Sequence, residues 1–385
     1  MLFVLLGAQR ANSQMASVDA AIGSPGVDGL IDAFAWRADE GALYAVGAFT
    51  SAGGAAASRA ARWVHGAWEA LNAGLNNRGL AAVALPASLG GGVAVAGAFT
   101  TAGNVLAQRV ALWDGAGFTA LGAGLNGLGL AVAVHDDGSG PALYVGGTFT
   151  MAGGVAAARV ARWDGQRWSA VGQGFAVGAV RALCAASVMG SGAALYAAVD
   201  APAADGSGVA SVWRWTGSQW EGVGGGFDGA IFDMAVFQGE LYACGAFSTA
   251  EGKSALRIAR FDGVSWSGLG GGLNAAAQRM ALFDDGQGER LIVAGDFLQA
   301  GGMAVERLAA WDGAVFAPLS VGGADGSVQS LFSYVDASGT HRLVVAGEFF
   351  HFGGEVVQRA AEVVGAAARV PGDVDGDGVV GPGDL

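Results

Sequence analysis

Residues 143–174 read LYVGGTFTMAGGVAAARVARWDGQRWSAVGQG, and this stretch is one copy of a unit that the chain repeats. A seventh copy, LYAAVDAP, has Ala201 at the place where the others have a Phe, and successive markers are 46 to 52 residues apart. A period of this length is typical of propeller blades and other repeat arrays. The marker Phe follows Gly-x in six copies, at Phe49, Phe99, Phe149, Phe247, Phe297 and Phe349.

Each copy contains four short β-type runs. The first is apolar, as in residues 182–186 and 280–283, and the others correspond to LYVGGTF, VARWDG and WSAVG of the quoted copy. Asp-Gly between two such runs predicts a hairpin, because Gly adopts the positive φ of the turn at little cost. This pair separates the third run from the fourth at Asp114-Gly115, Asp164-Gly165, Asp262-Gly263 and Asp312-Gly313.

The repeat therefore predicts an all-β fold, a seven-bladed β-propeller of four-stranded antiparallel blades over residues 17–370. One such sheet cannot bury both of its faces, but seven stacked around an axis can. Small Ala and Gly side chains suit the crowded first strands near the axis. Large aromatic residues are expected to fill the space between neighbouring blades: Trp113, Trp163, Trp168, Trp266, Trp311 and Phe261.

The two ends of the repeat predict how the ring closes. Residues 21–29, AIGSPGVDG, resemble residues 120–127, ALGAGLNG, which belong to the fourth run of a unit. The last copy passes through residues 359–365 without a Trp-containing fourth run. We therefore expect the N-terminus to donate the fourth strand of the last blade, which removes exposed sheet edges that would invite aggregation.

Composition excludes several classes of protein. The 385 residues are 52% hydrophobic and 14% charged, which supports a large core and argues against disorder. The net charge of −13 makes nucleic acid and anionic lipid unfavourable partners. The uncharged residues 79–99 contain Pro86 and a Gly-Gly-Gly turn, so we do not expect a membrane span there. Cys184 and Cys244 lie in apolar runs and are expected to be buried thiols.

The first residues bear on localisation. Residues 1–8, MLFVLLGA, are apolar and favour the remnant of a signal peptide within residues 1–16. We therefore expect the protein to be secreted or to lie at the cell surface.

Residues 371–385 have the composition of a calcium loop. Carboxylates at positions 1, 3 and 5 of a twelve-residue EF-hand-like loop surround a Gly at position 6, where the chain turns. Ca²⁺ takes six to eight oxygen ligands, and this pattern supplies them. The predicted ligands are Asp373, Asp375, Asp377, the carbonyl oxygen of Val379 and Asp384.

This loop resembles half of a type I dockerin, with Asp where a general EF-hand has Glu at position 12. Dockerins attach non-catalytic proteins and polysaccharide-degrading enzymes to cohesins. The resemblance covers residues 371–385 and implies a cohesin-like partner that is bound through Ca²⁺. The repeat itself resembles secreted bacterial propellers with F-T-x-A-G-G…V-A-R-W-D-G units and kelch-like propeller regions of fungal cell-surface markers. That resemblance implies a fold and no single activity.

Two sets of polar residues are candidates for chemistry. The residue before the marker is small in most copies but is a carboxylate at Asp200, Asp296 and Glu348. These carboxylates line the axial channel as a cation site or an acid/base pair, or each pairs with a local Arg or backbone N–H. An Arg ten residues after the marker recurs in six copies, which favours a structural role over ligand binding: Arg59, Arg109, Arg159, Arg257, Arg307 and Arg359.

No established catalytic motif is present. The four histidines show no metal-ligand spacing, and no Ser-His-Asp arrangement, P-loop or dinucleotide fingerprint is evident. We therefore expect a propeller with a binding or structural role that presents loops to a carbohydrate or a cell-surface protein. The alternative is a polysaccharide-active hydrolase or lyase that uses the channel carboxylates.

Overall fold

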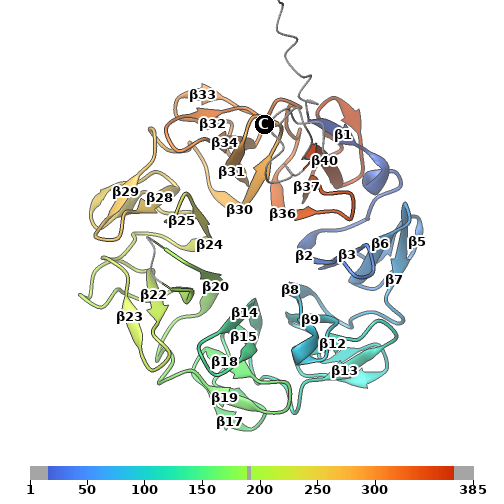
Figure 1. Ribbon diagram of the computed structural model, residues 1–385, viewed down its shortest axis with the longest axis vertical. Coiled ribbons are helices and arrows are strands. Elements are labelled where there is room, and N and C mark those ends of the chain that lie inside the picture. Colours follow the sequence, from blue (N-terminus) through green and yellow to red (C-terminus); the bar gives the residue numbers. More distant parts are fainter. Residues whose placement is uncertain (1–15, 189–191, 368–385) are drawn as a thin grey trace, which may run out of the picture.

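Seven four-stranded antiparallel sheets surround a central axis in the computed structural model, which describes residues 16–188 and 192–367 (Figure 1). In six of these sheets the four strands are hydrogen-bonded in the order in which the chain forms them, so these blades are meanders; the seventh combines three such strands with one from the N-terminus. The prediction of a seven-bladed all-β propeller is confirmed. Strands β2, β8, β14, β20, β24, β30 and β36 lie nearest the axis (Figure 1).

The blades follow the chain in order. Blade 1 has β2 (Ile31–Arg37), β3 (Ala42–Gly47), β6 (Ala60–Val64) and β7 (Ala67–Ala70), and blade 2 has β8 (Gly79–Ala84), β9 (Val93–Gly97), β12 (Val110–Trp113) and β13 (Phe118–Ala120). Blade 3 has β14 (Gly129–Asp136), β15 (Pro141–Gly147), β18 (Val160–Trp163) and β19 (Trp168–Ala170), and blade 4 has β20 (Val180–Ala186), β21 (Ala194–Val199), β22 (Ser211–Trp215) and β23 (Trp220–Gly222). Blade 5 has β24 (Ile231–Phe237), β25 (Glu240–Gly245), β28 (Ile258–Phe261) and β29 (Trp266–Gly268), and blade 6 has β30 (Ala277–Asp284), β31 (Glu289–Gly295), β34 (Leu308–Trp311) and β35 (Phe316–Ala317).

The N-terminal strand closes the ring, as the sequence predicted. Blade 7 consists of β36 (Val328–Val335), β37 (Thr340–Gly347), β40 (Ala360–Ala367) and β1 (Ser17–Asp19), with β1 at its outer edge. Val18 is paired antiparallel with Val363. The 3₁₀ helix η1 (Ala21–Gly23) follows, and the carbonyl of Ile22 accepts the indole N–H of Trp68 from blade 1 at 2.8 Å. The first and last blades are therefore tied together by main chain and side chain.

Each Gly-rich loop after the marker Phe forms a short ribbon, which the sequence did not predict. Six such two-stranded ribbons occur in the part of the chain that the structure describes. Strands of two residues are too short to show a periodic pattern. The ribbons are β4 (Ser51–Ala52) with β5 (Ala55–Ala56), β10 (Thr101–Ala102) with β11 (Val105–Leu106), β16 (Met151–Ala152) with β17 (Val155–Ala156), β26 (Thr249–Ala250) with β27 (Lys253–Ser254), β32 (Gln299–Ala300) with β33 (Met303–Ala304), and β38 (His351–Phe352) with β39 (Glu355–Val356).

The core lies between adjacent blades. All six marker Phe side chains are at most 1% exposed. Trp163 and Trp168 of blade 3 share a cluster of buried side chains with Val110 and Leu121 of blade 2, as the prediction of aromatic filling requires. The indole N–H of Trp168 also donates to the carbonyl of Leu121 at 2.7 Å. Burial of apolar area between blades is therefore the main stabilising term for the ring.

The recurrent Arg has the structural role that its repetition predicted. All six adopt the left-handed region, with φ between +63° and +66°, which non-Gly residues rarely do. The N–H of Arg109 donates to the carbonyl of the marker Phe99 at 2.8 Å. Its guanidinium donates to the carbonyl of Leu125 at 2.9 Å. Arg109 therefore joins the marker Phe to the next loop through hydrogen bonds.

Every innermost strand has a β-bulge after its first residue. A bulged residue is unpaired, and its side chain is turned relative to the regular alternation. Sequence reasoning placed only small residues near the axis, but several bulged side chains are large. Small side chains occupy the next position in most blades. The bulged residues are Asp32, Leu80, Leu130, Arg181, Phe232, Gln278 and Gln329.

The two cysteines and the uncharged residues 79–99 also lie within the described ranges. Cys184 and Cys244 are free thiols; Cys244 is buried as expected, whereas Cys184 is partly exposed. Desolvation nevertheless raises the pKa of Cys184 to about 12. The uncharged residues 79–99 form β8, the 3₁₀ helix η2 (Ala87–Leu89) and β9. No helix in the described ranges has the length and apolarity needed to cross a membrane.

Candidate functional site

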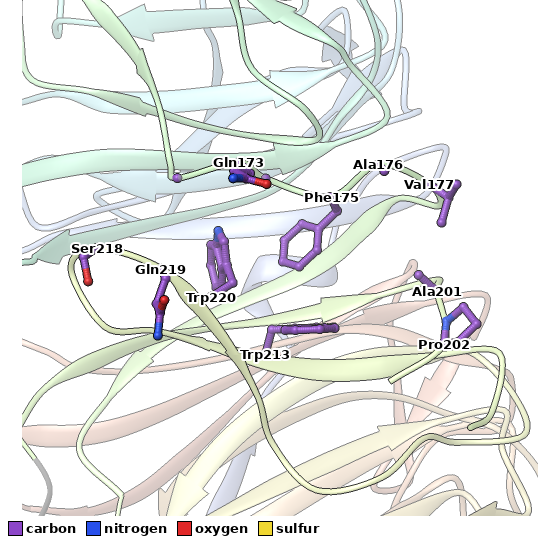
Figure 2. Close-up of a pocket in the computed structure, with 12 residues that line it drawn as sticks. Gln173, Phe175, Ala176, Val177, Ala201, Pro202, Trp213, Ser218, Gln219 and Trp220 are labelled. Atoms are coloured by element: carbon purple, nitrogen blue, oxygen red, sulfur yellow. The ribbon is translucent and has the colours of Figure 1, made fainter. Parts of the chain in front are cut away.

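A cavity of about 680 Å³ opens between blades 3 and 4. Its walls come from the loop after β19, the loop after β21, strand β22 and the β22–β23 turn. Figure 2 shows the rings of Phe175, Trp213 and Trp220 grouped between the segment that carries Gln173 and the turn that carries Ser218 and Gln219. This volume and this aromatic lining are typical of a small-ligand site.

The cavity lies at a junction that lacks a contact found at the other six, which we call the ribbon clamp. At six junctions, an Asp or Asn side chain of one blade accepts two backbone N–H groups from the next blade's ribbon, at 2.7–3.0 Å. Between blades 3 and 4 this position is Ala176, whose side chain has no hydrogen-bond acceptor. Residues 202–209 accordingly form a turn-rich loop in place of a ribbon. The clamping residues are Asp28, Asn76, Asn126, Asp228, Asn274 and Asp325.

Three further positions change together in blade 4. The marker is Ala201 in place of Phe, and the recurrent Arg is replaced by Ser211. Trp213 stands where the register of the other blades has a fully buried Ala. The large side chain of this blade is therefore on the third strand and not on the loop after the second. The equivalent alanines are Ala61, Ala111, Ala161, Ala259, Ala309 and Ala361.

Loss of the ribbon uncovers the outer aromatic residue of blade 4. In blade 3 the ribbon covers the equivalent Trp168 so closely that a Cβ added to Gly153 would lie 2.4 Å from its ring. Trp168 is 5% exposed, and its counterparts in the four blades 1, 2, 5 and 6 are at most 8% exposed. Trp220 is only half-buried. One aromatic face that other blades cover is thus open to solvent at this junction.

The three rings form a fixed aromatic surface. The ring centroids of Phe175 and Trp220 are 5.0 Å apart, and those of Phe175 and Trp213 are 5.9 Å apart. The indole N–H of Trp213 donates to the Ser211 hydroxyl at 2.9 Å, and that of Trp220 donates to the Val171 carbonyl at 3.1 Å. Both indole donors are satisfied within the protein, so the rings are positioned before a ligand arrives.

The polar groups of the cavity are uncharged. Gln173, Ser218 and Gln219 are exposed at its rim, and no Asp, Glu, Lys, Arg or His lines it. Val177 is 59% exposed beside them. An apolar surface with amide and hydroxyl groups at its edge suits a neutral ligand that has both an apolar face and hydroxyl groups.

The three candidate carboxylates are not brought together. Asp200 forms an ion pair with Arg181 at 2.5 Å. Asp296 accepts hydrogen bonds from the Gln278 amide, at 3.2 Å, and from the Ser327 hydroxyl. Glu348 is exposed. No hydrogen bond joins any two of these three described carboxylates, and none of them lines the cavity between blades 3 and 4.

The predicted metal ligands and the described residues do not overlap. Over residues 16–188 and 192–367, no group of three or more His, Cys, Asp or Glu side chains is placed to hold a metal ion. The predicted calcium ligands Asp373, Asp375, Asp377, Val379 and Asp384 lie outside the described residues.

Comparisons with known proteins agree with the fold. No protein-family description and no curated protein matches the sequence. The structure of BBS1N in complex with ARL6DN, soaked with lead, is similar over 92% of this chain and 97% of its own, with a TM-score of 0.52 and 10% identity. The computationally designed Ika8 protein aligns over 87% of this chain and 96% of its own, with a TM-score of 0.46 and 12% identity. The likeness to the BBS1N structure concerns the fold alone. At these identities it carries nothing about function.

Sequence reasoning missed the aromatic cavity although its signal was present. The copy with Ala201 in the marker position was recognised as degenerate, but the consequence of losing the Phe was not drawn. Trp213 and Ala176 depart from the repeat within the same junction. The signal was one copy of the repeat that departs from the other six at several positions.

Proposed function

We propose that this protein is a non-catalytic binding module and that the cavity between blades 3 and 4 holds a carbohydrate. The observation that carries the proposal is the joint presence of Trp213 and Trp220 as partly exposed rings in a cavity without charged residues. The C–H groups on the apolar face of a pyranose ring are weakly positive, and they contact the electron-rich face of an aromatic ring favourably. The Gln173, Ser218 and Gln219 side chains are suited to bind its hydroxyl groups.

A binding role accounts for the carboxylates better than a hydrolase or a lyase does. Hydrolysis of a glycosidic bond ordinarily uses two carboxyl groups that flank that bond. Asp200 is paired with Arg181, and Asp296 is bonded to Gln278 and Ser327. Neither carboxylate faces the aromatic cavity. These contacts support recognition of a sugar without its cleavage.

The ligand class is tested with a panel of neutral and acidic oligosaccharides. We expect neutral gluco-, manno- or galacto-oligosaccharides to bind more tightly than uronic-acid oligomers by about tenfold, or about 1.4 kcal/mol. The reason is that the cavity offers no cation and the net charge of the protein is −13. The measurement is a glycan array followed by calorimetric titration. Release of a shortened sugar would contradict the binding role, and a preference for acidic oligomers would contradict the neutral class.

We propose that the C-terminal acidic loop binds Ca²⁺ and attaches the protein to a cohesin-like partner outside the cell or at its surface. The support is the spacing of Asp373, Asp375 and Asp377 and the Asp384 carboxylate in the sequence. The full chain is expected to bind one Ca²⁺ ion, and Asp375→Asn/Asp377→Asn is expected to lose it, as measured by calcium titration. Unchanged binding by the double variant would place calcium elsewhere. The melting temperature of the propeller is expected to be the same with and without chelator.

A further inference from the structure

A second cavity, of about 250 Å³, lies at the axis of the ring. Six of the seven bulged residues line it, so its walls come from six different blades. Leu80, Leu130 and Phe232 form the apolar part of the wall. Arg181, Gln278 and Arg279 contribute donors of hydrogen bonds. This cavity is separate from the aromatic one, because the two share no lining residue.

Two adjacent blades break the rule for the position that follows the bulge. Five blades have a small residue there, whereas blade 5 has Asp233 and blade 6 has Arg279. The chain as a whole is acidic, with 20 Lys and Arg against 33 Asp and Glu. An Arg placed at the axis is therefore a local departure from both the repeat and the overall charge. The small residues are Ala33, Ala81, Ala131, Ala182 and Ser330.

The other charged groups near this cavity already have partners. Arg78 binds Asp32 through two hydrogen bonds, at 2.6 and 2.7 Å, and Arg181 is paired with Asp200. The carboxylate of Asp233 accepts the backbone N–H groups of Met234 and Met280, both at 2.9 Å. Burial raises the pKa of Asp233, despite the field of Arg279 and these two hydrogen bonds.

Arg279 retains free donors toward the cavity. One of its terminal nitrogens donates to the backbone carbonyl of Gln278 at 2.8 Å. Within the described ranges, no carboxylate lies at ion-pair distance from it; Asp32 and Asp233 act on it only through space. A guanidinium has five N–H groups in a planar fork that matches a carboxylate, and most of this capacity is unused here.

We propose that the axial cavity binds a small organic carboxylate, with Arg279 holding the anionic group and the apolar wall holding a short hydrocarbon part. The Gln278 side-chain amide, next in sequence to Arg279, already donates one N–H to Asp296 at 3.2 Å and has a second N–H as a further donor. A volume of about 250 Å³ is small, so it suits a short-chain acid better than a sugar polymer. The carboxylate is favoured over phosphate because Leu80, Leu130 and Phe232 make one side of the cavity apolar.

The test is a ligand-observed NMR titration of the full chain with butyrate, butyramide and inorganic phosphate at low ionic strength. We expect saturable binding of butyrate, with binding of butyramide and phosphate weaker by tenfold or more. Arg279→Gln is expected to weaken butyrate binding at least tenfold. Arg167→Gln, which changes an Arg whose side chain is 86% exposed, is the matched control and is expected to bind butyrate normally.

A second variant separates loss of the site from loss of the fold. Leu130→Trp fills the cavity and leaves Arg279 and its neighbours in place, so it is also expected to abolish butyrate binding while the melting temperature stays close to that of the natural protein. Equal binding of butyramide, tighter binding of phosphate, or unchanged butyrate binding by both variants would overturn the proposal. Changes in the aromatic cavity, such as Trp213→Ala, are expected to leave butyrate binding unaltered. The proposals for the two cavities can therefore be contradicted independently.

Discussion

Phe149→Ala is expected to lower the free energy of unfolding by about 3–5 kcal/mol. The Phe149 side chain is 1% exposed and packs in the cluster that joins blades 2 and 3. Its removal takes away buried apolar area and leaves a cavity that the surrounding sheets cannot close, because strands on both sides are fixed by their hydrogen bonds. The measurement is equilibrium unfolding in denaturant, monitored by tryptophan fluorescence.

Met151→Ala is the matched control for this variant. Met151 lies two residues away on the ribbon and is 43% exposed, so its truncation is expected to change stability by less than about 0.5 kcal/mol. If Phe149→Ala cost no more than Met151→Ala, the marker Phe would not be a principal contact between blades. The absence of this Phe at position 201 would then explain nothing about the cavity.

Trp213→Ala is expected to weaken binding of a neutral oligosaccharide by about 2 kcal/mol, or roughly 30-fold. The ring of Trp213 forms one wall of the aromatic cavity and is positioned by the hydrogen bond from its indole N–H to Ser211. Alanine is the residue that the other six blades have at this position, so the strand tolerates the change. The measurement is calorimetric titration of the natural protein and the variant with the same sugar.

The double variant Ala201→Phe/Trp213→Ala restores the marker and the small residue of the other blades. It is expected to fill the cavity from the loop after β21 and to abolish sugar binding without lowering the melting temperature. Trp163→Phe in blade 3, which lies outside the cavity lining, is the control and is expected to bind sugar normally. Sugar binding that survives in the double variant would place the ligand site elsewhere.

Much of the fold could be predicted from the sequence because the residues that recur in each repeat specify local geometry. The Asp-Gly pairs mark hairpins; the glycines of these four pairs have φ between +94° and +105°. The marker Phe identifies six of the seven blades because its side chain is almost fully buried in each of them. The N-terminal strand was recognisable because residues 21–29 resemble the end of a repeat unit.

The candidate sites could not be predicted from the same pattern. The aromatic cavity depends on Ala176, Ala201, Ser211 and Trp213, which are separated in sequence and come together only at one junction. Whether such a loss leaves a cavity or is filled by a neighbouring loop depends on packing in three dimensions. The axial cavity depends on a bulge in each inner strand, and a bulge that inserts one residue into a run of apolar residues leaves no clear mark in the sequence.

A crystal structure with a bound neutral oligosaccharide tests whether the degenerate junction between blades 3 and 4 is the ligand site. We expect a sugar ring stacked on Trp213 or Trp220, with hydroxyl groups bonded to Gln173, Ser218 or Gln219. A sugar bound at another junction, over a ribbon or in the axial cavity, with the aromatic cavity empty at a saturating concentration, would contradict it.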